Sequence, residues 1–252
     1  MKRIAIFLFV LLLSLSVAVV IVASVMFRPL GDLDDFQNPM LNASRDGDTA
    51  EIQRLLTDGS DINTSDAFNN TPLSIAAHFG QTEAAEMLIR NGAEINGIEG
   101  AMSPVQCAVY RGHSAAVALL LREGADPNVA DKSGTTPLST TDRKGDTAMV
   151  KALLDAGSNI EVANNRGWRP LHVALRSTQT SDTDRLAAVK VLLEYGADPN
   201  AVNAGGSEND FKHDSHVGYR RSLPNKGNTP LSIANSNGFS EIVALLKAHG
   251  GT

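Results

Sequence analysis

The sequence is poor in cysteine and in aromatic residues. One cysteine among 252 residues excludes a disulfide within the chain, and it excludes a zinc site built from several thiolates. Aromatic residues make up 5% of the chain and include a single tryptophan, so large apolar anchors are scarce. Hydrophobic residues make up 42% and charged residues 20%, which is typical of a globular rather than a disordered protein.

Positive charge is also scarce outside the N-terminus. The chain has 22 basic and 28 acidic residues, and the first 28 residues contain three of the basic ones and no acidic one. The remainder therefore carries 19 basic against 28 acidic residues, a net charge of −9. This balance argues against non-specific binding of nucleic acid, and we expect no nucleic-acid partner.

A long apolar run begins close to the N-terminus. Residues 4–27 carry no charge and would span about 36 Å as a helix, against a hydrocarbon core of roughly 30 Å. The apolar part of a cleavable signal peptide is usually shorter, about 7–15 residues. Small residues around Ala18 and Ala23 nevertheless leave cleavage open, and a buried helix of a soluble protein is a third alternative. We expect residues 1–28 to be a signal anchor or a signal peptide, and residues 29–37 to be a linker.

Charges on the two sides of the apolar run predict its orientation. Lys2 and Arg3 precede the run, whereas Asp32, Asp34 and Asp35 follow it closely. The positive-inside rule then keeps the N-terminus in the cytoplasm and exports the rest of the chain. We therefore expect a single-pass membrane protein whose main domain lies outside, in the bacterial periplasm; cleavage would give a secreted or periplasmic protein instead.

Most of the chain consists of a repeated unit of about 33 residues. The unit starts with a short segment whose second residue is proline, and these starts lie at Thr71, Ser103, Thr136, Arg169 and Thr229. The same frame extends back to Asn38. A second apolar segment and a glycine follow in five units, at Gly59, Gly92, Gly124, Gly157 and Gly196.

The chemistry of the unit predicts two short helices. A hydroxyl such as that of Thr71 caps a helix N-terminus, and proline suits the first helical position because its missing N–H is not needed there. Small Ala76 and Ala77 allow close packing, and Gly80 can end the helix in the left-handed conformation. Neither helix buries its apolar face alone, so neighbouring units must stack.

These motifs resemble the ankyrin repeat family over residues 38–252. The resemblance implies an all-α solenoid of stacked helix–turn–helix units, here preceded by one N-terminal hydrophobic helix, with hairpin-like loops and a concave recognition face. Family members typically bind proteins and carry no catalytic machinery, so we expect no enzyme activity and no cofactor. The expected units, numbered 1 to 6, are residues 38–70, 71–102, 103–135, 136–168, 169–228 and 229–252.

Unit 5 departs from the pattern by two insertions. Six residues are inserted between its two helices, around residues 178–184, and another 21 within residues 201–228. The longer insertion contains four residues of types that can bind a metal, Asp210, His213, Asp214 and His216. The same residues are also common in a solvated loop that binds no metal. We expect no metal site there. Tyr219, Arg220 and Arg221 resemble a partner contact more closely, because tyrosine and arginine are common interface anchors.

The remaining unusual residues are predicted to be structural. Unit 4 has Thr141 and Asp142 where unit 2 has two alanines, which predicts a local adjustment of the helix or, alternatively, a functional carboxylate. Cys107 occupies an apolar position of its unit and is predicted to pack in the core. His113 and His172 stand where the family often has histidine, so we expect them to bind neighbouring backbone. No catalytic motif is present.

The resemblance also implies which residues face a partner. In the family, the concave face is lined by the residues before the glycine that ends the first helix, and by the loop tips. In this chain they are Phe68, His78, Phe79, Tyr110, Arg111, Lys132, Arg143, Lys144, Arg166, Trp168 and Arg176. The cations among them are either ordinary solvated side chains or a site for a protein with an acidic surface.

Three functions remain open from the sequence. The first is a non-enzymatic protein-binding module exposed outside the cytoplasmic membrane. The second is a secreted effector that acts on a foreign cell, and the third is an accessory subunit that stabilises an exported enzyme.

Overall fold

The computed structural model describes residues 38–141, 146–176, 180–203 and 227–252. Within these ranges the regular secondary structure is helical, apart from one isolated parallel bridge between Gly100 and Asp131. This confirms the all-α class, whereas the hydrophobic helix expected at residues 4–27 lies outside the described residues. The helices are α2 (Pro39–Asp46), α3 (Thr49–Thr57), α4 (Pro72–Phe79), α5 (Thr82–Arg90), α6 (Pro104–Arg111), α7 (Ser114–Arg122), α8 (Pro137–Thr140), α9 (Thr147–Asp155), α10 (Pro170–Arg176), α11 (Asp182–Glu194), α12 (Pro230–Asn237) and α13 (Ser240–Ala248). Among them none has both the length and the apolar character needed to cross a membrane.

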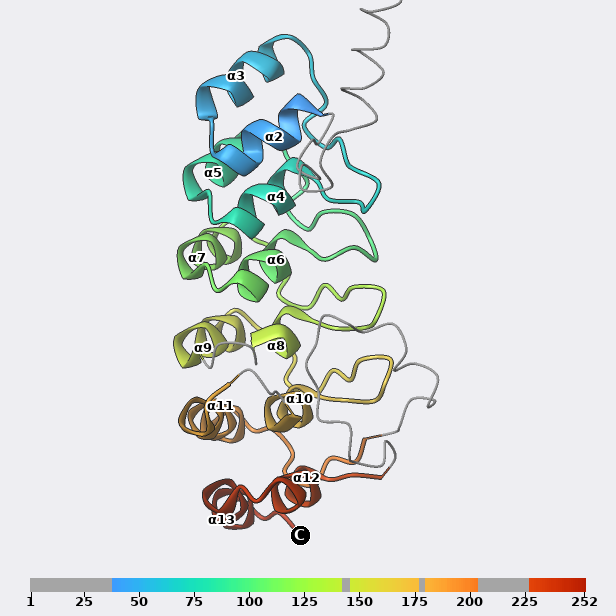
Figure 1. The fold of residues 1–252 in the computed structure, drawn as a ribbon, viewed down its shortest axis with the longest axis vertical. Coiled ribbons are helices and arrows are strands. Elements are labelled where there is room, and N and C mark those ends of the chain that lie inside the picture. Colours follow the sequence, from blue (N-terminus) through green and yellow to red (C-terminus); the bar gives the residue numbers. More distant parts are fainter. Residues whose placement is uncertain (1–37, 142–145, 177–179, 204–226) are drawn as a thin grey trace, which may run out of the picture. The chain divides into compact units, whose positions relative to one another are not determined.

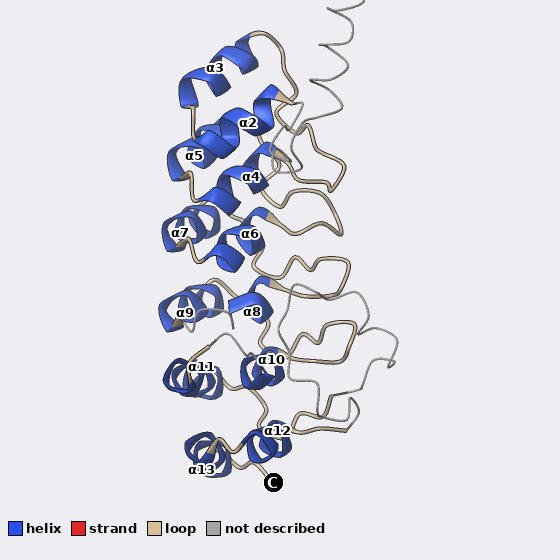
Figure 2. Cartoon of the chain, in the orientation of Figure 1, coloured by secondary structure: helices blue, strands red, loops and turns tan. Residues whose placement is uncertain are grey.

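The helices of residues 38–252 form two columns. The first helix of each unit lies in one column and the second helix in the other, and hairpin loops project beside the first helices (Figure 1, Figure 2). Ala76 and Ala77 of α4 are fully buried, which allows α4 to pack closely against α2 and α6. Leu88 and Leu120 of the second helices are fully buried as well. The core is thus continuous from unit to unit, as expected for a repeat solenoid.

The first helices begin and end as their sequence predicts. The side-chain oxygens of Thr71, Ser103, Thr136 and Thr229 each accept a hydrogen bond from a backbone N–H in the first turn, and proline follows each of them. At the other end of α4, Gly80 has a φ of +72°, in the left-handed region. Local signals therefore fix the helix boundaries of units 2 and 3.

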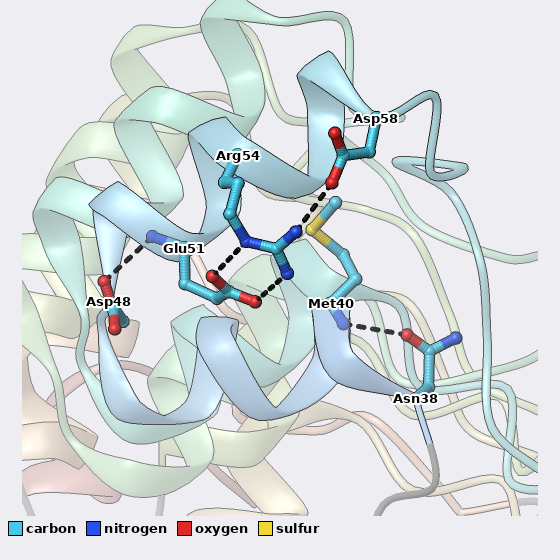
Figure 3. Close-up of polar contacts among 6 residues, drawn as sticks. All are labelled: Asn38, Met40, Asp48, Glu51, Arg54 and Asp58. Carbon is cyan, nitrogen blue, oxygen red and sulfur yellow. Dashed lines mark hydrogen bonds and ion pairs between the residues drawn. The ribbon is translucent and has the colours of Figure 1, made fainter.

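Polar side chains cap both helices of unit 1 (Figure 3). Asn38 and Asp48 each accept a backbone N–H at 2.9 Å, at the starts of α2 and α3. On the exposed side of α3, Arg54 donates to both carboxylate oxygens of Glu51, at 2.6 and 2.7 Å, and to Asp58 at 2.6 Å. The hydrogen bond from Arg54 lowers the pKa of Glu51. A charged outer surface of this kind suits the first unit of a stack.

A row of side-chain hydrogen bonds joins the ends of successive units. In each bond a side-chain oxygen of one unit accepts a backbone N–H of the next unit, at 2.7–2.9 Å. We call this row the polar ladder; its acceptor–donor pairs are Asn63–Glu94, Asn96–Asp126, Asn128–Asn159, Glu161–Asp198 and Asn200–Thr252. The acceptors lie in the segment between the second helix of a unit and the tip of its hairpin, so the ladder fixes one edge of the stack.

The hairpin tips share one pattern of backbone hydrogen bonds. In unit 3, Asp131 N–H donates to Thr135 O at 3.1 Å, and Gly134 N–H donates to Asp131 O at 2.8 Å. In unit 5 the corresponding bonds run from Asn203 N–H to Asn228 O and from Gly227 N–H to Asn203 O, both at 3.1 Å. We call this arrangement the neck.

The neck locates the long insertion of unit 5. Two residues separate the bonded positions 131 and 134 in unit 3, whereas 23 residues separate positions 203 and 227 in unit 5. All 21 extra residues therefore enter at the tip itself. The inserted residues 204–226 lie outside the described ranges.

The shorter insertion of unit 5, expected between the two helices around residues 178–184, lies partly within the second of them, because α11 begins at Asp182. α11 has 13 residues, whereas α5, α7, α9 and α13 have nine, because α11 begins about one turn earlier. Its N-cap is Ser181, whose Oγ accepts the N–H of Asp184 at 3.1 Å. The added turn carries Arg185, which pairs with Asp182 and lies 4.4 Å from the centroid of the Phe239 ring in unit 6. The extra turn thus packs against the next unit.

Unit 4 is irregular in structure where it is irregular in sequence. α8 has four residues, against eight in α4, α6 and α12. The helix ends before Thr141, whose Oγ1 donates to Leu138 O at 2.7 Å. Asp142, the residue predicted to disturb this unit, lies outside the described ranges.

Candidate protein-binding site

The ends of α4 and α6 bring four of the predicted binding residues together. His78 and Phe79 end α4, and Tyr110 and Arg111 end α6. The helices α4 and α6 pack side by side (Figure 1). The His78 ring therefore stacks on the Tyr110 ring, with ring centroids 6.4 Å apart. The His78 ring also meets Phe79 edge to face, with centroids 5.0 Å apart. We call these four residues the aromatic patch.

The aromatic patch combines exposed apolar surface with positive charge. Phe79 is 41% exposed, Arg111 is exposed, and His78 and Tyr110 are half-buried. Burial, followed by the charges of Arg111 and His113, lowers the pKa of His78, so its ring is mainly neutral at pH 7. Aromatic and arginine side chains in this setting are the usual anchors of protein interfaces.

Hydrogen bonds between neighbouring units hold the C-terminal ends of the first helices. His113 Nε2 lies 3.1 Å from His78 O, and Gln81 Nε2 donates to Arg45 O at 2.9 Å one unit earlier. The His113 ring is so close to Gly80 that a Cβ added there would lie 2.7 Å from Nδ1. The backbone-binding role predicted for His113 is confirmed. Gln81 plays the same part and was missed, although it too follows the glycine that ends a first helix.

The hairpin tips present the second set of predicted residues. Phe68 is 82% exposed at the first tip, Lys132 is exposed, and Arg166 is half-buried. Asn165 joins two tips, because its side chain donates to Lys132 O and its N–H to Ser133 O, both at 2.9 Å. Loops held in this way lose less conformational entropy when a partner binds.

Two predicted contact residues are buried, so the expectation that they lie on the surface is wrong. Trp168 is 1% exposed and Arg176 is 5% exposed. The guanidinium carbon of Arg176 lies 3.9 Å from the centroid of the Trp168 ring, a distance typical of a cation–π contact. Trp168 is also held to its own hairpin, because its backbone N–H donates to Asn164 Oδ1 at 3.1 Å. The pair therefore packs where units 4 and 5 meet and offers little surface to a partner.

Other predicted residues lie outside the described ranges. The predicted contacts among them are Arg143, Lys144, Tyr219, Arg220 and Arg221, and the residues considered as metal ligands are Asp210, His213, Asp214 and His216. Within the ranges that the structure does describe, no three His, Cys, Asp or Glu side chains come together as possible metal ligands.

Two buried residues with reactive side chains have structural roles, as predicted. Cys107 packs in the core, and burial raises its pKa to about 12, so the thiol stays protonated. His172 is fully buried; its Nδ1 accepts the N–H of Arg169 at 3.4 Å, and its Nε2 lies 3.0 Å from Ala201 O. Both ring nitrogens of His172 are thus used by neighbouring backbone.

Comparison with known proteins agrees with this architecture. A family model described as ankyrin repeats (3 copies) matches residues 23–99, 40–131 and 105–203, which together span more than half of the chain. Among solved structures, an ankyrin repeat domain from Acinetobacter baumannii AYE is similar, with a TM-score of 0.67 and 27% sequence identity. The match covers 85% of this chain and 98% of that domain. This chain belongs to the ankyrin repeat family.

Proposed function

We propose that this chain binds a protein partner through the aromatic patch and the hairpin tips. Ankyrin repeats are generally protein–protein interaction modules and are typically not catalytic. The observation that carries the proposal is the aromatic patch, where Phe79 leaves 41% of its surface in water beside the exposed cation Arg111. Covering such a ring stabilises a complex, and arginine adds a directional contact.

The chemistry of the exposed cations favours an acidic partner surface. Arg111 at the end of α6 and Lys132 at the tip of the unit 3 hairpin are both exposed, on a chain whose net charge beyond residue 28 is −9. Exposed cations on a chain of net negative charge attract an acidic partner surface and disfavour a basic one. By sequence position, Arg143 and Lys144 of unit 4 correspond to His78 and Phe79 of unit 2, so they are candidates for the same partner.

Capture of a partner by matched variants tests the binding site. The partner is first obtained by copurification with the full chain and mass spectrometry. We expect the double variant Phe79→Ala, Arg111→Ala to weaken capture about 30-fold or more, since the loss of one interface anchor alone costs about 2 kcal/mol or more. Arg122→Ala is the control, because Arg122 is an exposed cation on α7 that pairs with Glu123.

Both variants should melt within a few degrees of the unmodified chain, because surface substitutions change stability by about 0.5 kcal/mol or less. Undiminished capture by the double variant would remove the aromatic patch from consideration. Residues 219–221 of the long insertion would then be the leading site.

The proposed location of the domain is outside the cytoplasmic membrane. Its support is the uncharged run of residues 4–27, with Lys2 and Arg3 before it and Asp32, Asp34 and Asp35 after it. In this proposal the run anchors the chain with its N-terminus in the cytoplasm and the repeats in the periplasm. Cleavage after the run would instead release the repeats, as required of a secreted effector.

A reporter that works only outside the cytoplasm tests the location. Fused after Thr252, the reporter should be active, and the protein should stay with the membranes after a carbonate wash. An inactive reporter would rule out export. Activity in the culture medium, with a mature N-terminus beyond Ser24, would favour the secreted effector, and copurification with one exported enzyme would favour the accessory subunit.

A further inference from the structure

The aromatic patch has a titratable group at its centre. The His78 ring lies between the rings of Tyr110 and Phe79, at 6.4 and 5.0 Å, and is half-buried. Its pKa is lowered by burial and then by electrostatic interactions with Arg111 and His113. In the absence of a partner, the surroundings of His78 therefore oppose its protonation.

Charged groups lie on each of the helices that pack against α4, which are α2, α5 and α6. On α2, Asp46 is paired with Arg45 at 2.9 Å, so its negative charge is already matched. On α5 the charged group of the first turn is Glu83. On the side of α6, Arg111 and the ring of His113 both act to disfavour the charged form of His78.

We propose that the aromatic patch binds an acidic segment of the partner that also carries an apolar side chain, and that His78 takes up a proton when this segment binds. The inference rests on the proposed function and names the chemistry of its partner. The apolar side chain packs on the exposed ring of Phe79 and reaches the half-buried ring of Tyr110. The carboxylate lies near Arg111 and His78, offsets the charge of Arg111 and favours the imidazolium form of His78.

Proton uptake makes the affinity depend on pH in a definite direction. The complex holds one more proton than the free chain between the pKa of free His78 and its higher pKa in the complex. Affinity therefore rises as pH falls through this interval, and it is constant above and below it. Each unit by which binding raises the pKa strengthens binding by up to about tenfold at low pH.

The test uses a defined acidic peptide and the full chain in detergent. The probe is a short rhodamine-labelled peptide of glutamate and glycine with one central leucine, and binding is followed by fluorescence anisotropy from pH 8 to about pH 5.5. Glutamate stays ionised in this range, because its pKa is about 4.3. We expect the Kd to fall about five- to tenfold on acidification.

Three substitutions separate His78 from other causes of pH dependence. His78→Gln should bind with little change in Kd between the two pH limits. Arg111→Met should bind more weakly at both limits yet keep the pH dependence. The control His249→Gln should behave like the unmodified chain, because His249 lies at the end of α13, with its Nδ1 2.9 Å from Leu245 O.

The outcomes distinguish this inference from the proposed function. A Kd that does not change with pH, or a pH dependence that survives in His78→Gln while this variant melts normally, would overturn proton uptake by His78. Failure of the peptide to bind while the copurified partner is still captured would overturn the acidic segment. Loss of partner capture in Phe79→Ala, Arg111→Ala would still support the proposed function in either case.

Discussion

At the scale of single residues, burial separates the structural histidine from the candidate binding histidine. His172 is fully buried and uses both ring nitrogens, whereas His78 keeps part of its ring exposed. Burial lowers the pKa of His172, so the folded chain holds this ring neutral. A charged imidazole would have to leave the core or break its contact with Arg169 N–H.

The lowered pKa of His172 predicts how stability depends on pH. An unfolded histidine has a pKa of about 6.5, so in acid the unfolded chain binds more protons than the folded chain. The stability due to neutral His172 is complete above about pH 6.5 and is lost as pH falls toward the lower pKa of the folded state. Thermal melts between about pH 7.5 and pH 5 should show a falling Tm.

A matched variant isolates the contribution of His172. His172→Gln should be less stable by about 1–3 kcal/mol at pH 7.5, because a buried hydrogen bond is disturbed, and its Tm should fall less on acidification. His249→Gln should keep the pH dependence of the unmodified chain. An equal fall of Tm in all three proteins would contradict this assignment. His78 also has a lowered pKa and contributes to the dependence that remains in His172→Gln.

Residue types and register predicted the site only in part. His78, Phe79, Tyr110 and Arg111 could be assigned to one surface because neighbouring units repeat the same geometry. Burial of Trp168 could not be predicted, since it depends on the cation–π contact with Arg176 at the other end of α10. That contact is a property of two particular side chains and does not follow from the repeat.

At the scale of elements, the boundaries that local chemistry sets were predictable. The threonine or serine caps, the prolines and the terminal glycines act within a few residues, so the repeat frame gave the ends of α4 and α6. The start of α11 also had a local signal, because Ser181 and Asp184 have the spacing of a capping box. The residue spacings of the other units instead placed the whole insertion between the two helices.

Because the neck closes the tip of unit 5 on its own, we expect that the long insertion can be removed without loss of stability of the repeat domain. Residues 204–226 would be replaced by Lys-Ser, the pair that separates Asp131 from Gly134 in unit 3, so that Asn203 and Gly227 close an ordinary tip. Stability should be unchanged or higher by up to about 2 kcal/mol, because loop closure costs about 0.6 kcal/mol for each doubling of length. Chemical denaturation followed by circular dichroism measures the difference.

A control for this excision breaks the neck and keeps the insertion. Asn203→Ala removes the side-chain acceptor that receives Asn228 N–H at 2.8 Å and should destabilise by about 1–3 kcal/mol, because Asn203 is buried. If the excision instead costs several kcal/mol, the insertion contributes to packing and the neck is not a complete tip.

At the scale of the whole repeat domain, stability is expected to be uneven along the stack. A solenoid is stabilised by contacts between neighbours, so a weak unit divides it into parts that unfold separately. α8, with four residues, has fewer helical hydrogen bonds than the eight-residue α6 beside it. Unit 4 is therefore expected to be the weakest point among the described units.

Hydrogen exchange measured by mass spectrometry tests this expectation. Amides of residues 138–140 in α8 should exchange faster than those of residues 105–109 in α6. Leu120→Ala in α7, which removes a fully buried side chain, should speed exchange mainly in units 1 to 3 and lower stability by about 2–5 kcal/mol. Uniform protection along the chain, with one common response to Leu120→Ala, would show that unit 4 does not interrupt cooperativity.

The polar ladder has a mechanical consequence. Its bonds connect consecutive units one after another along the stack, from Asn63 to Thr252, so a pull on the two ends of the repeats loads them in series. Links in series carry the same tension, and the weakest link yields first while the others remain closed. A domain built in this way extends by detaching one unit at a time, and its tensile strength is that of a single junction.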